Sequence, residues 1–177
     1  MIELHGEHAV LRTMERAHCR ELWEAYDPTE PLPTEPLHPG LSIEGADKWF
    51  EEIQAKQGKE HVYLGIFCEG RLVGDIQIAS IGWRHRTASL GLGIARQADR
   101  GRGLGTDVAR TLLRYAFDHL DLYRVYAATT AYNLAMQRVL ERCGFLQEGR
   151  EREAIYAGGK RWDRLCYGLL RHEFQED

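Results

Sequence analysis

Hydrophobic and polar residues recur with two periods along the 177-residue chain, and these periods divide it into predicted helices and strands. Leu104, Val108, Leu112 and Tyr115 recur at the spacing of one helical face. Strand-like runs lie between glycine-containing turns, one of them Glu69-Gly70-Arg71. We predict helices over residues 15–26, 46–56, 104–119 and 134–143, and strands over residues 10–13, 61–68, 72–81, 87–95, 122–129, 145–151 and 162–170.

The resulting order, β-α-α-β-β-β-α-β-α-β-β, predicts one α/β domain over residues 1–177, with a central mixed sheet flanked by helices. We find no internal repeat, low-complexity tract or second domain. Residues 27–40 contain all five prolines, which excludes regular structure there. Irregular loops of that length are uncommon in compact domains and are often functional.

The composition is that of an ordinary soluble globular protein, with 44% hydrophobic and 28% charged residues. The net charge of −4 argues against a nucleic-acid binder. The four cysteines form no Cys-x-x-Cys pair, as in reduced cytosolic proteins. No apolar run reaches the ~18–20 residues of a membrane span, and no signal peptide is evident. We therefore expect a cytoplasmic protein that contacts neither nucleic acid nor membrane.

A glycine-rich segment, residues 100–106, lies between a predicted strand and the predicted helix 104–119. Glycine lets the backbone approach a ligand closely, and the first turn of a helix binds phosphate groups through its N–H groups and dipole. Arg96, Arg100 and Arg102 add positive charge. A P-loop is excluded because the segment has no lysine, and the glycine spacing fails the dinucleotide pattern. A turn that merely connects strand to helix is the remaining alternative.

Arg100, Gly103 and Gly105 match the Arg/Gln-x-x-Gly-x-Gly/Ala signature of the GNAT acetyltransferases. Residues 132–145 (Tyr-Asn-Leu-Ala-Met-Gln-Arg-Val-Leu-Glu-Arg-Cys-Gly-Phe) resemble the second half of a GNAT domain. With residues 162–170 they look like the subgroup of the ribosomal-protein alanine N-acetyltransferases (RimJ/RimL-like). The resemblance implies that acetyl passes from acetyl-CoA directly to an amine, without a metal. It also implies a GNAT fold, whose sheet is mostly antiparallel.

The resemblance assigns roles to several positions. Strands 87–95 and 122–129 would splay apart around the pantetheine arm, and backbone groups of Leu92 and Ile94 would bond its amides and polarise the thioester. Relief of crowding in the sheet is the simpler interpretation of the nearby glycines. Asn133 would contact the pantetheine region, and it also stands at an expected helix N-cap. The pyrophosphate would lie against Arg100, Gly101, Arg102, Gly103, Leu104, Gly105 and Thr106.

Two positions depart from the family pattern. Leu140 stands where many members have a tyrosine that protonates the leaving thiolate, and Met136 stands where the ribosomal subgroup often has a serine. No general acid can be named from the sequence. Besides Asn133, the candidate catalytic residues are His85, before the pantetheine strand, and Glu44, at the end of the proline-rich loop. A solvated surface role is the simpler interpretation of both.

The acceptor side is predicted from charge. No basic residue lies between Arg20 and Lys48, whereas seven acidic ones do: Glu21, Glu24, Asp27, Glu30, Glu35, Glu44 and Asp47. In GNAT proteins the first two helices and their connection, here residues 27–44, line the acceptor side. An acidic rim there would attract a cationic amine, unless it is only a solvated face. Aromatic residues would line an apolar acceptor pocket or belong to ordinary core: Trp23, Tyr26, Trp49 and Phe50.

We therefore expect an acceptor with a primary amine, with a protein N-terminus as the leading candidate. The alternatives are a small amine, namely a polyamine, an aminoglycoside-like antibiotic or an amino sugar, and a catalytically weak acyl-CoA-binding domain. A homodimer is expected from the family alone. His5 and His8 belong to an N-terminus that we predict to be unanchored, so we expect no metal site there.

Overall fold

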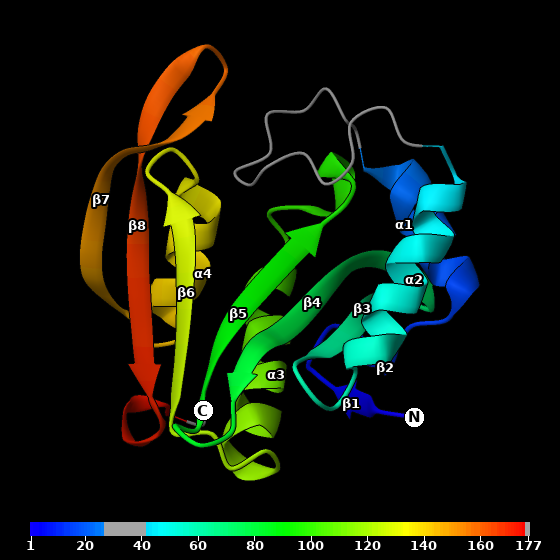
Figure 1. Ribbon diagram of the computed structural model, residues 1–177, viewed down its shortest axis with the longest axis horizontal. Helices are drawn as coiled ribbons and strands as arrows, with labels where there is room; N and C mark the ends of the chain where they lie inside the picture. The colour runs from blue at the N-terminus through cyan, green and yellow to red at the C-terminus, as the bar shows by residue number, and fades with distance from the viewer. Residues whose placement is uncertain (27–41, 176–177) are drawn as a thin grey trace.

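The computed structural model describes residues 1–26 and 42–175. In this part of the chain eight strands form one sheet in the order β1-β2-β3-β4-β5-β6-β8-β7 (Figure 1). The strands are β1 (Glu3–His5), β2 (Val10–Thr13), β3 (Val62–Cys68), β4 (Arg71–Gly82), β5 (Thr87–Ile94), β6 (Arg124–Thr130), β7 (Leu146–Ala157) and β8 (Lys160–Leu170). The helices are α1 (Arg16–Ala25), α2 (Glu44–Lys56), α3 (Leu104–Asp118) and α4 (Leu134–Arg142), with short 3-10 turns η1 (Gln97–Asp99) and η2 (Arg171–Glu173).

Helices cover both faces of the sheet, which explains why its central strands are apolar on both sides. Leu64 and Ile66 of β3 belong to the larger core, which β3 shares with α3 and α4. Tyr63 and Phe67 of the same strand belong to a second core with α1 and α2 (Figure 1). Successive side chains of a strand point to opposite faces, so the unbroken apolar run of β3 serves both cores. The prediction of a mixed α/β sheet flanked by helices is confirmed.

Each predicted helix and strand is present with its ends within two residues of the prediction, except that β7 continues six residues beyond the predicted end at residue 151, and β1 has no counterpart in the prediction. Its three residues carry no recognisable pattern and pair with β2 through the backbone. The turn that follows is fixed to the first turn of α3, because the Asp107 carboxylate accepts the N–H groups of Glu7, His8 and Ala9 at 2.7, 2.9 and 3.1 Å. The expectation of an unanchored N-terminus is therefore wrong.

Asp107→Ala removes this anchor. We expect the free energy of unfolding to fall by about 1–3 kcal/mol, because three hydrogen bonds to a charged acceptor are lost together. Urea denaturation measures the loss. Asp118→Ala is the matched control at the other end of α3, where the carboxylate forms an exposed ion pair with Arg171 at 3.5 Å. Such pairs contribute about 0–1 kcal/mol. Equal losses in the two variants would contradict the anchoring role of Asp107.

Strands β5 and β6, the one parallel pair among the described strands, separate after three residues. Their register covers Thr87–Arg124, Ala88–Val125 and Ser89–Tyr126, although both strands continue for four or five residues beyond it (Figure 1). The Ala95 N–H donates to the Val73 carbonyl at 2.9 Å, on the β4 side. By the alternation of an antiparallel ladder, the backbone groups of Leu92 and Ile94 then face away from β4, into the opening. The predicted splayed parallel pair is confirmed.

Candidate active site

The glycine-rich segment connects the open end of β5 to the start of α3, and its glycines serve two purposes. Gly101 and Gly103 have φ values of 76° and 82°, in the left-handed region that favours glycine. A Cβ at either position would meet no heavy atom within 4 Å. Glycine is therefore favoured there by the backbone conformation and not by a lack of space. At Gly105 a Cβ would lie only 3.0 Å from Val139 Cγ2, so glycine favours close packing of α3 against α4.

The start of α3 presents N–H groups toward the opening. Gly103 is the N-cap, and the first intrahelical bonds run to its carbonyl from the N–H groups of Thr106 and Asp107, at 3.1 and 3.2 Å. The N–H groups of Leu104 and Gly105 precede these bonds, as in any first helical turn. Together with the positive end of the helix dipole, they form an arrangement that suits a phosphate group.

The arginines of this region differ from expectation in where their side chains point. The Arg100 guanidinium turns back to the end of β5, where it donates to the carbonyls of Ile94 and Ala95 at 3.0 and 3.2 Å. Arg96 donates to the Leu72 carbonyl at 3.3 Å. Backbone carbonyls at a strand end need donors, and these side chains supply them. Arg102 is exposed on the loop itself, so it is the arginine whose charge lies at the surface of the glycine-rich segment.

An ion pair that the sequence did not predict holds η1, which immediately precedes the glycine-rich segment. The Arg71 guanidinium binds both carboxylate oxygens of Asp99 at 2.9 and 2.6 Å, and joins η1 to the start of β4. Asp99 is buried, and the hydrogen bonds from Arg71 lower the pKa of its carboxyl. The two residues are 28 positions apart in the chain, and neither has a local motif that would pair them.

Asn133 lies at the same end of the opening as the glycine-rich segment, because β5 and β6 are parallel and each residue follows its strand. Its Oδ1 accepts the Met136 N–H at 3.1 Å, so the predicted N-cap of α4 is confirmed. The bond uses the side-chain oxygen and leaves the amide NH2 group for another partner. Leu140, by contrast, is fully buried in the larger core, and Met136 packs against that core.

The two candidate bases, His85 and Glu44, do not lie at the opening between β5 and β6. His85 lies exposed in the turn before β5, at the opposite end of that strand from Ile94, and eight strand residues span about 25 Å. Glu44 is exposed at the start of α2, where the Ser42 hydroxyl donates to its carboxylate. This hydrogen bond lowers the pKa of Glu44, which makes the group a weaker base.

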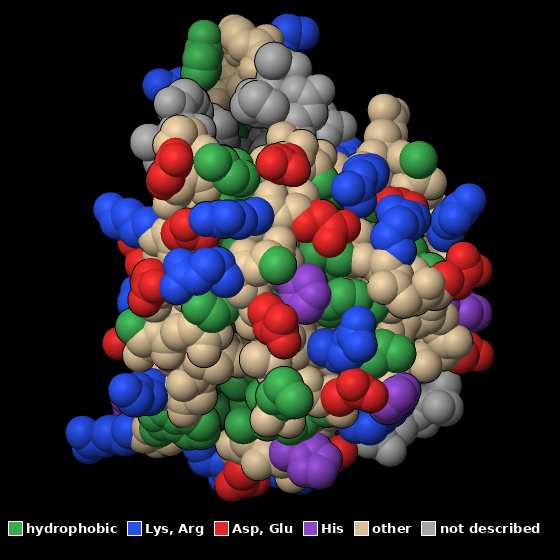
Figure 2. All heavy atoms as spheres, turned by 90° about the vertical axis from the view of Figure 1, so that its right-hand side faces the viewer, with side chains coloured by type: hydrophobic (Ala, Val, Ile, Leu, Met, Phe, Trp, Pro, Cys, Tyr) green, Lys and Arg blue, Asp and Glu red, His purple; other side chains and the backbone are tan. Residues whose placement is uncertain are grey.

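Two of the four described members of the acidic rim, Asp47 and Glu21, form ion pairs. Asp47 is bound by Arg20 at 2.9 and 2.6 Å and by Arg16 at 3.6 Å. Glu51 pairs with Arg16 as well, and Glu21 lies 4.0 Å from Arg96. Figure 2 shows acidic and basic side chains interspersed over the side of the molecule that carries α1 and α2. The proline-rich loop lies outside the described residues, and so do three acidic members of the rim: Asp27, Glu30 and Glu35.

A half-buried polar cluster lies on the α1–α2 face of the sheet, beside β5. Tyr26 and Tyr63 each donate a hydroxyl hydrogen bond of 2.6 Å to Asp75, one to each carboxylate oxygen. Asp75 is opposite Gly93 of β5, where an added Cβ would collide with the Tyr26 hydroxyl and lie 3.5 Å from Asp75 Oδ1. Gly93 therefore makes room for this cluster. The only signal in the sequence is an aspartate inside the apolar strand 72–81.

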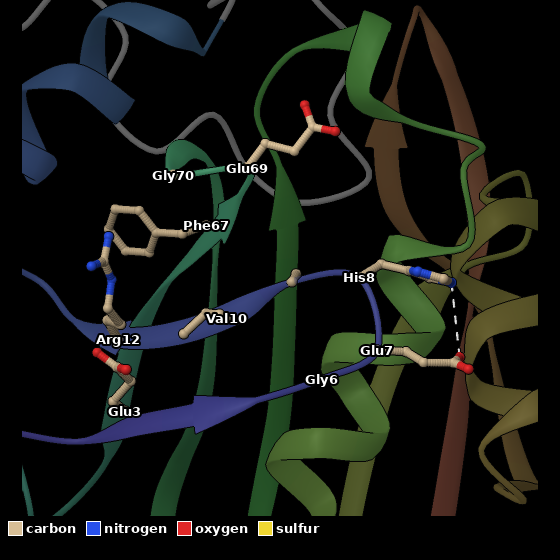
Figure 3. Close-up of a pocket in the computed structure, with 10 residues that line it drawn as sticks. Glu3, Gly6, Glu7, His8, Val10, Arg12, Phe67, Glu69 and Gly70 are labelled. Atoms are coloured by element: carbon tan, nitrogen blue, oxygen red, sulfur yellow. Dashed lines mark ion pairs between the residues drawn. The ribbon is translucent and has the colours of Figure 1, made fainter.

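A hollow of about 390 Å³ lies elsewhere, between the β1–β2 hairpin and the β3–β4 turn (Figure 3). Arg12 stacks over the Phe67 ring at 4.0 Å, and His8 lies 3.8 Å from the Glu7 carboxylate on the other side. None of the predicted site residues lines it. Within residues 1–26 and 42–175, no three metal-ligating side chains gather, and no helix is long and apolar enough to cross a membrane.

Comparison with known proteins agrees with this geometry. The acetyltransferase (GNAT) domain family matches residues 8–146. A putative ribosomal N-acetyltransferase, YdaF of Bacillus subtilis (strain 168), is 29% identical over 175 residues, which cover 96% of this chain and 95% of the relative. A spermidine N(1)-acetyltransferase of Vibrio cholerae (serotype O1, strain ATCC 39315 / El Tor Inaba N16961) is 25% identical over 60% of this chain and 61% of its own.

The structure of RimL, a ribosomal L7/L12 alpha-N-protein acetyltransferase in complex with coenzyme A, has the same fold. Its TM-score is 0.81 at 20% identity, over 96% of this chain and 98% of that one. The resemblance to GNAT proteins of the RimJ/RimL type is thus confirmed at the level of sequence family and fold. With a family match over more than half of its length, the chain belongs to the GNAT acetyltransferases and is an N-acetyltransferase of that family.

Proposed function

We propose that this protein transfers the acetyl group of acetyl-CoA to a protein N-terminal α-amine. The observation that carries the donor half is the unpaired edge of β5, from which residues 95–103, with η1, lead to the start of α3. The edge offers the backbone groups of Leu92 and Ile94 to an extended polar chain, in the way that a partner strand would bond them. The helix start then offers N–H groups to a diphosphate.

These residues fit acetyl-CoA in polarity. Leu92 and Ile94 would bond the pantetheine amides, residues 101–106 would hold the pyrophosphate, and Asn133 would use its amide NH2 group on the pantetheine. Arg100 contributes by fixing the end of β5 through hydrogen bonds to the carbonyls of Ile94 and Ala95. When bound, acetyl-CoA supplies an activated acetyl thioester, and a backbone N–H of β5 would polarise its carbonyl.

The choice of acceptor rests on charge and on amine chemistry. An α-amino group has a pKa of about 7.7–8.0 and is partly neutral at physiological pH, whereas a lysine-type amine at about 10.4 is almost wholly protonated. A polycation such as spermidine would be recognised by several unpaired carboxylates. On the described acceptor side arginines bind Asp47, Glu51 and Glu21, and Glu24 and Glu44 of the described rim lie outside these ion pairs. This pairing favours a single amine over a polyamine, although one relative is named a spermidine acetyltransferase.

Release of free thiol from acetyl-CoA tests the proposal. A peptide with a free N-terminal alanine should be acetylated faster than spermidine or an aminoglycoside, and the same peptide with a blocked N-terminus should release no thiol. Preference for spermidine would instead support the small-amine alternative. Tight acetyl-CoA binding without turnover of any amine would support an acyl-CoA-binding domain.

A further inference from the structure

The Asp75 cluster places a negative charge on the acceptor face, without a positive partner in the described part of the chain. Asp75 is half-buried, and both of its carboxylate oxygens accept tyrosine hydroxyls at 2.6 Å. None of the described Lys, Arg or His side chains forms an ion pair with it. A carboxylate held among apolar groups without a counter-charge lowers stability, so a function is the natural reason to keep it.

The cluster also lies beside the strand edge assigned to the thioester. Asp75 is the register partner of Gly93, and Gly93 lies between Leu92 and Ile94, the two residues whose backbone groups face the opening. Because Gly93 has no side chain, the Asp75 carboxylate and the Tyr26 hydroxyl approach the β5 backbone directly. An amine that approached the thioester from the α1–α2 face would meet this carboxylate.

Aromatic rings surround the cluster on the same face. Trp49 packs edge-on against Tyr63, with ring centroids 5.9 Å apart, and Trp23 lies 6.3 Å from Trp49. Tyr63 itself is buried. Aromatic faces attract cations, and the apolar surroundings strengthen the pull of one carboxylate on an ammonium group. The arrangement suits one primary amine on an apolar stem.

We propose that Asp75 binds the acceptor amine and accepts its proton, while Tyr26 and Tyr63 act as positioning residues that aim the carboxylate. The inference rests on the proposed function. The ammonium N–H bond breaks, its electron pair stays on nitrogen, and its proton moves to Asp75. The neutral amine then forms a C–N bond with the thioester carbonyl carbon, the C–S bond breaks, and the thiolate takes a second proton from the attacking nitrogen. Asp75 returns its proton to solvent.

The environment of Asp75 supports the role of a base. Burial raises the pKa of its carboxyl, and the hydrogen bonds from Tyr26 and Tyr63 lower that pKa in part. A raised pKa brings the carboxylate closer to an amine in proton affinity. Besides the two tyrosines, Cys19 of α1 senses this charge, which helps to raise its pKa, and Arg100 at the end of β5 acts in the lowering direction on the pKa of Tyr26.

Asp75→Asn keeps the shape of the side chain and removes the base. With acetyl-CoA and a peptide bearing a free N-terminal alanine, we expect kcat/KM to fall by about 100-fold or more near pH 7. The gap to wild type should narrow toward about pH 9.5, because the α-amine is then already neutral. Affinity for acetyl-CoA should not change, and Tm should not fall, since a neutral amide avoids the burial of a charge.

Two further variants sharpen the result. Tyr63→Phe removes one hydrogen bond that lowers the pKa of Asp75, so the acidic limb of the kcat/KM–pH profile should move to higher pH. Asp118→Asn makes the same charge change at the far end of α3, and its profile should match wild type. A pH-independent gap in Asp75→Asn, wild-type activity in that variant, or a parallel loss of acetyl-CoA affinity would each overturn the inference.

A second experiment separates failure of this inference from failure of the proposed function. If wild type releases no thiol with any amine, titration of the alanyl peptide into the protein saturated with coenzyme A decides the inference on binding alone. Peptide binding that Asp75→Asn abolishes supports Asp75 as the amine site. Absence of peptide binding to wild type, or equal binding to both proteins, overturns it.

Discussion

Glutamate in place of Gly103 is expected to weaken acetyl-CoA binding by about 100-fold or more. Gly103 caps α3 at a φ of 82°, so a side chain there first adds the cost of a left-handed residue, about 1–2 kcal/mol. Its carboxylate would then stand where the pyrophosphate is proposed to lie. Two like charges about 4 Å apart repel by about 1–4 kcal/mol at effective dielectric constants of 80 to 20. The strain lowers stability, whereas the repulsion lowers affinity. A pyrophosphate carries two negative charges and each 1.4 kcal/mol is about tenfold in affinity, so the repulsion alone reaches about 100-fold.

Isothermal titration with acetyl-CoA measures the loss, and Gly158→Glu is its matched control. Gly158 lies between β7 and β8, has a φ of 58° and has no heavy atom within 4 Å of an added Cβ. The control therefore carries a similar backbone strain and the same added charge, far along the chain from the helix start. We expect both variants to lose a similar amount of stability and only Gly103→Glu to lose affinity. Equal affinities would mean that the phosphate site lies elsewhere.

The elements that the sequence predicts well are those whose signal is local. The helical spacing from Leu104 to Tyr115 and the apolar run of β3 each reflect burial of one element, so both appear near their predicted bounds. Strand β1 has no such signal, because three residues pair through the backbone and the following turn is held by Asp107, about a hundred residues away. A pattern within the strand cannot encode a contact made by a distant helix.

In the candidate site, too, the features with a local signal could be predicted and those that depend on distant residues could not. The glycine-rich segment and the Asn133 cap are local motifs, and parallel pairing of β5 with β6 brings them to one end of the sheet. The direction of the Arg100 side chain is not local, because it depends on carbonyls that the end of β5 leaves without a strand partner. The cluster around Asp75 joins residues 12 and 49 positions away, and only the folded sheet shows that Gly93 leaves space for it.

Leu140→Ala is expected to lower the free energy of unfolding by about 2–5 kcal/mol, the range for a leucine removed from a packed core. Leu140 has 0% exposure and packs with residues of α3 in the larger core. Leu134→Ala is the control in the same helix. Its side chain is 57% exposed, and a change there should alter stability by less than about 0.5 kcal/mol. Urea denaturation of both variants measures the difference.

The same burial decides what a tyrosine at this position would do. Many GNAT proteins have the acid that protonates the thiolate here, but a residue directed into the core of this chain cannot reach the opening between β5 and β6. Leu140→Tyr should therefore cost about 1–3 kcal/mol through overpacking and should not raise kcat. A tyrosine variant as stable as wild type and faster in thiol release would show that α4 can turn this position toward the opening. If Leu140→Tyr is destabilised and no faster in thiol release, position 140 does not supply the acid. The thiolate then takes its proton from the attacking amine or from water.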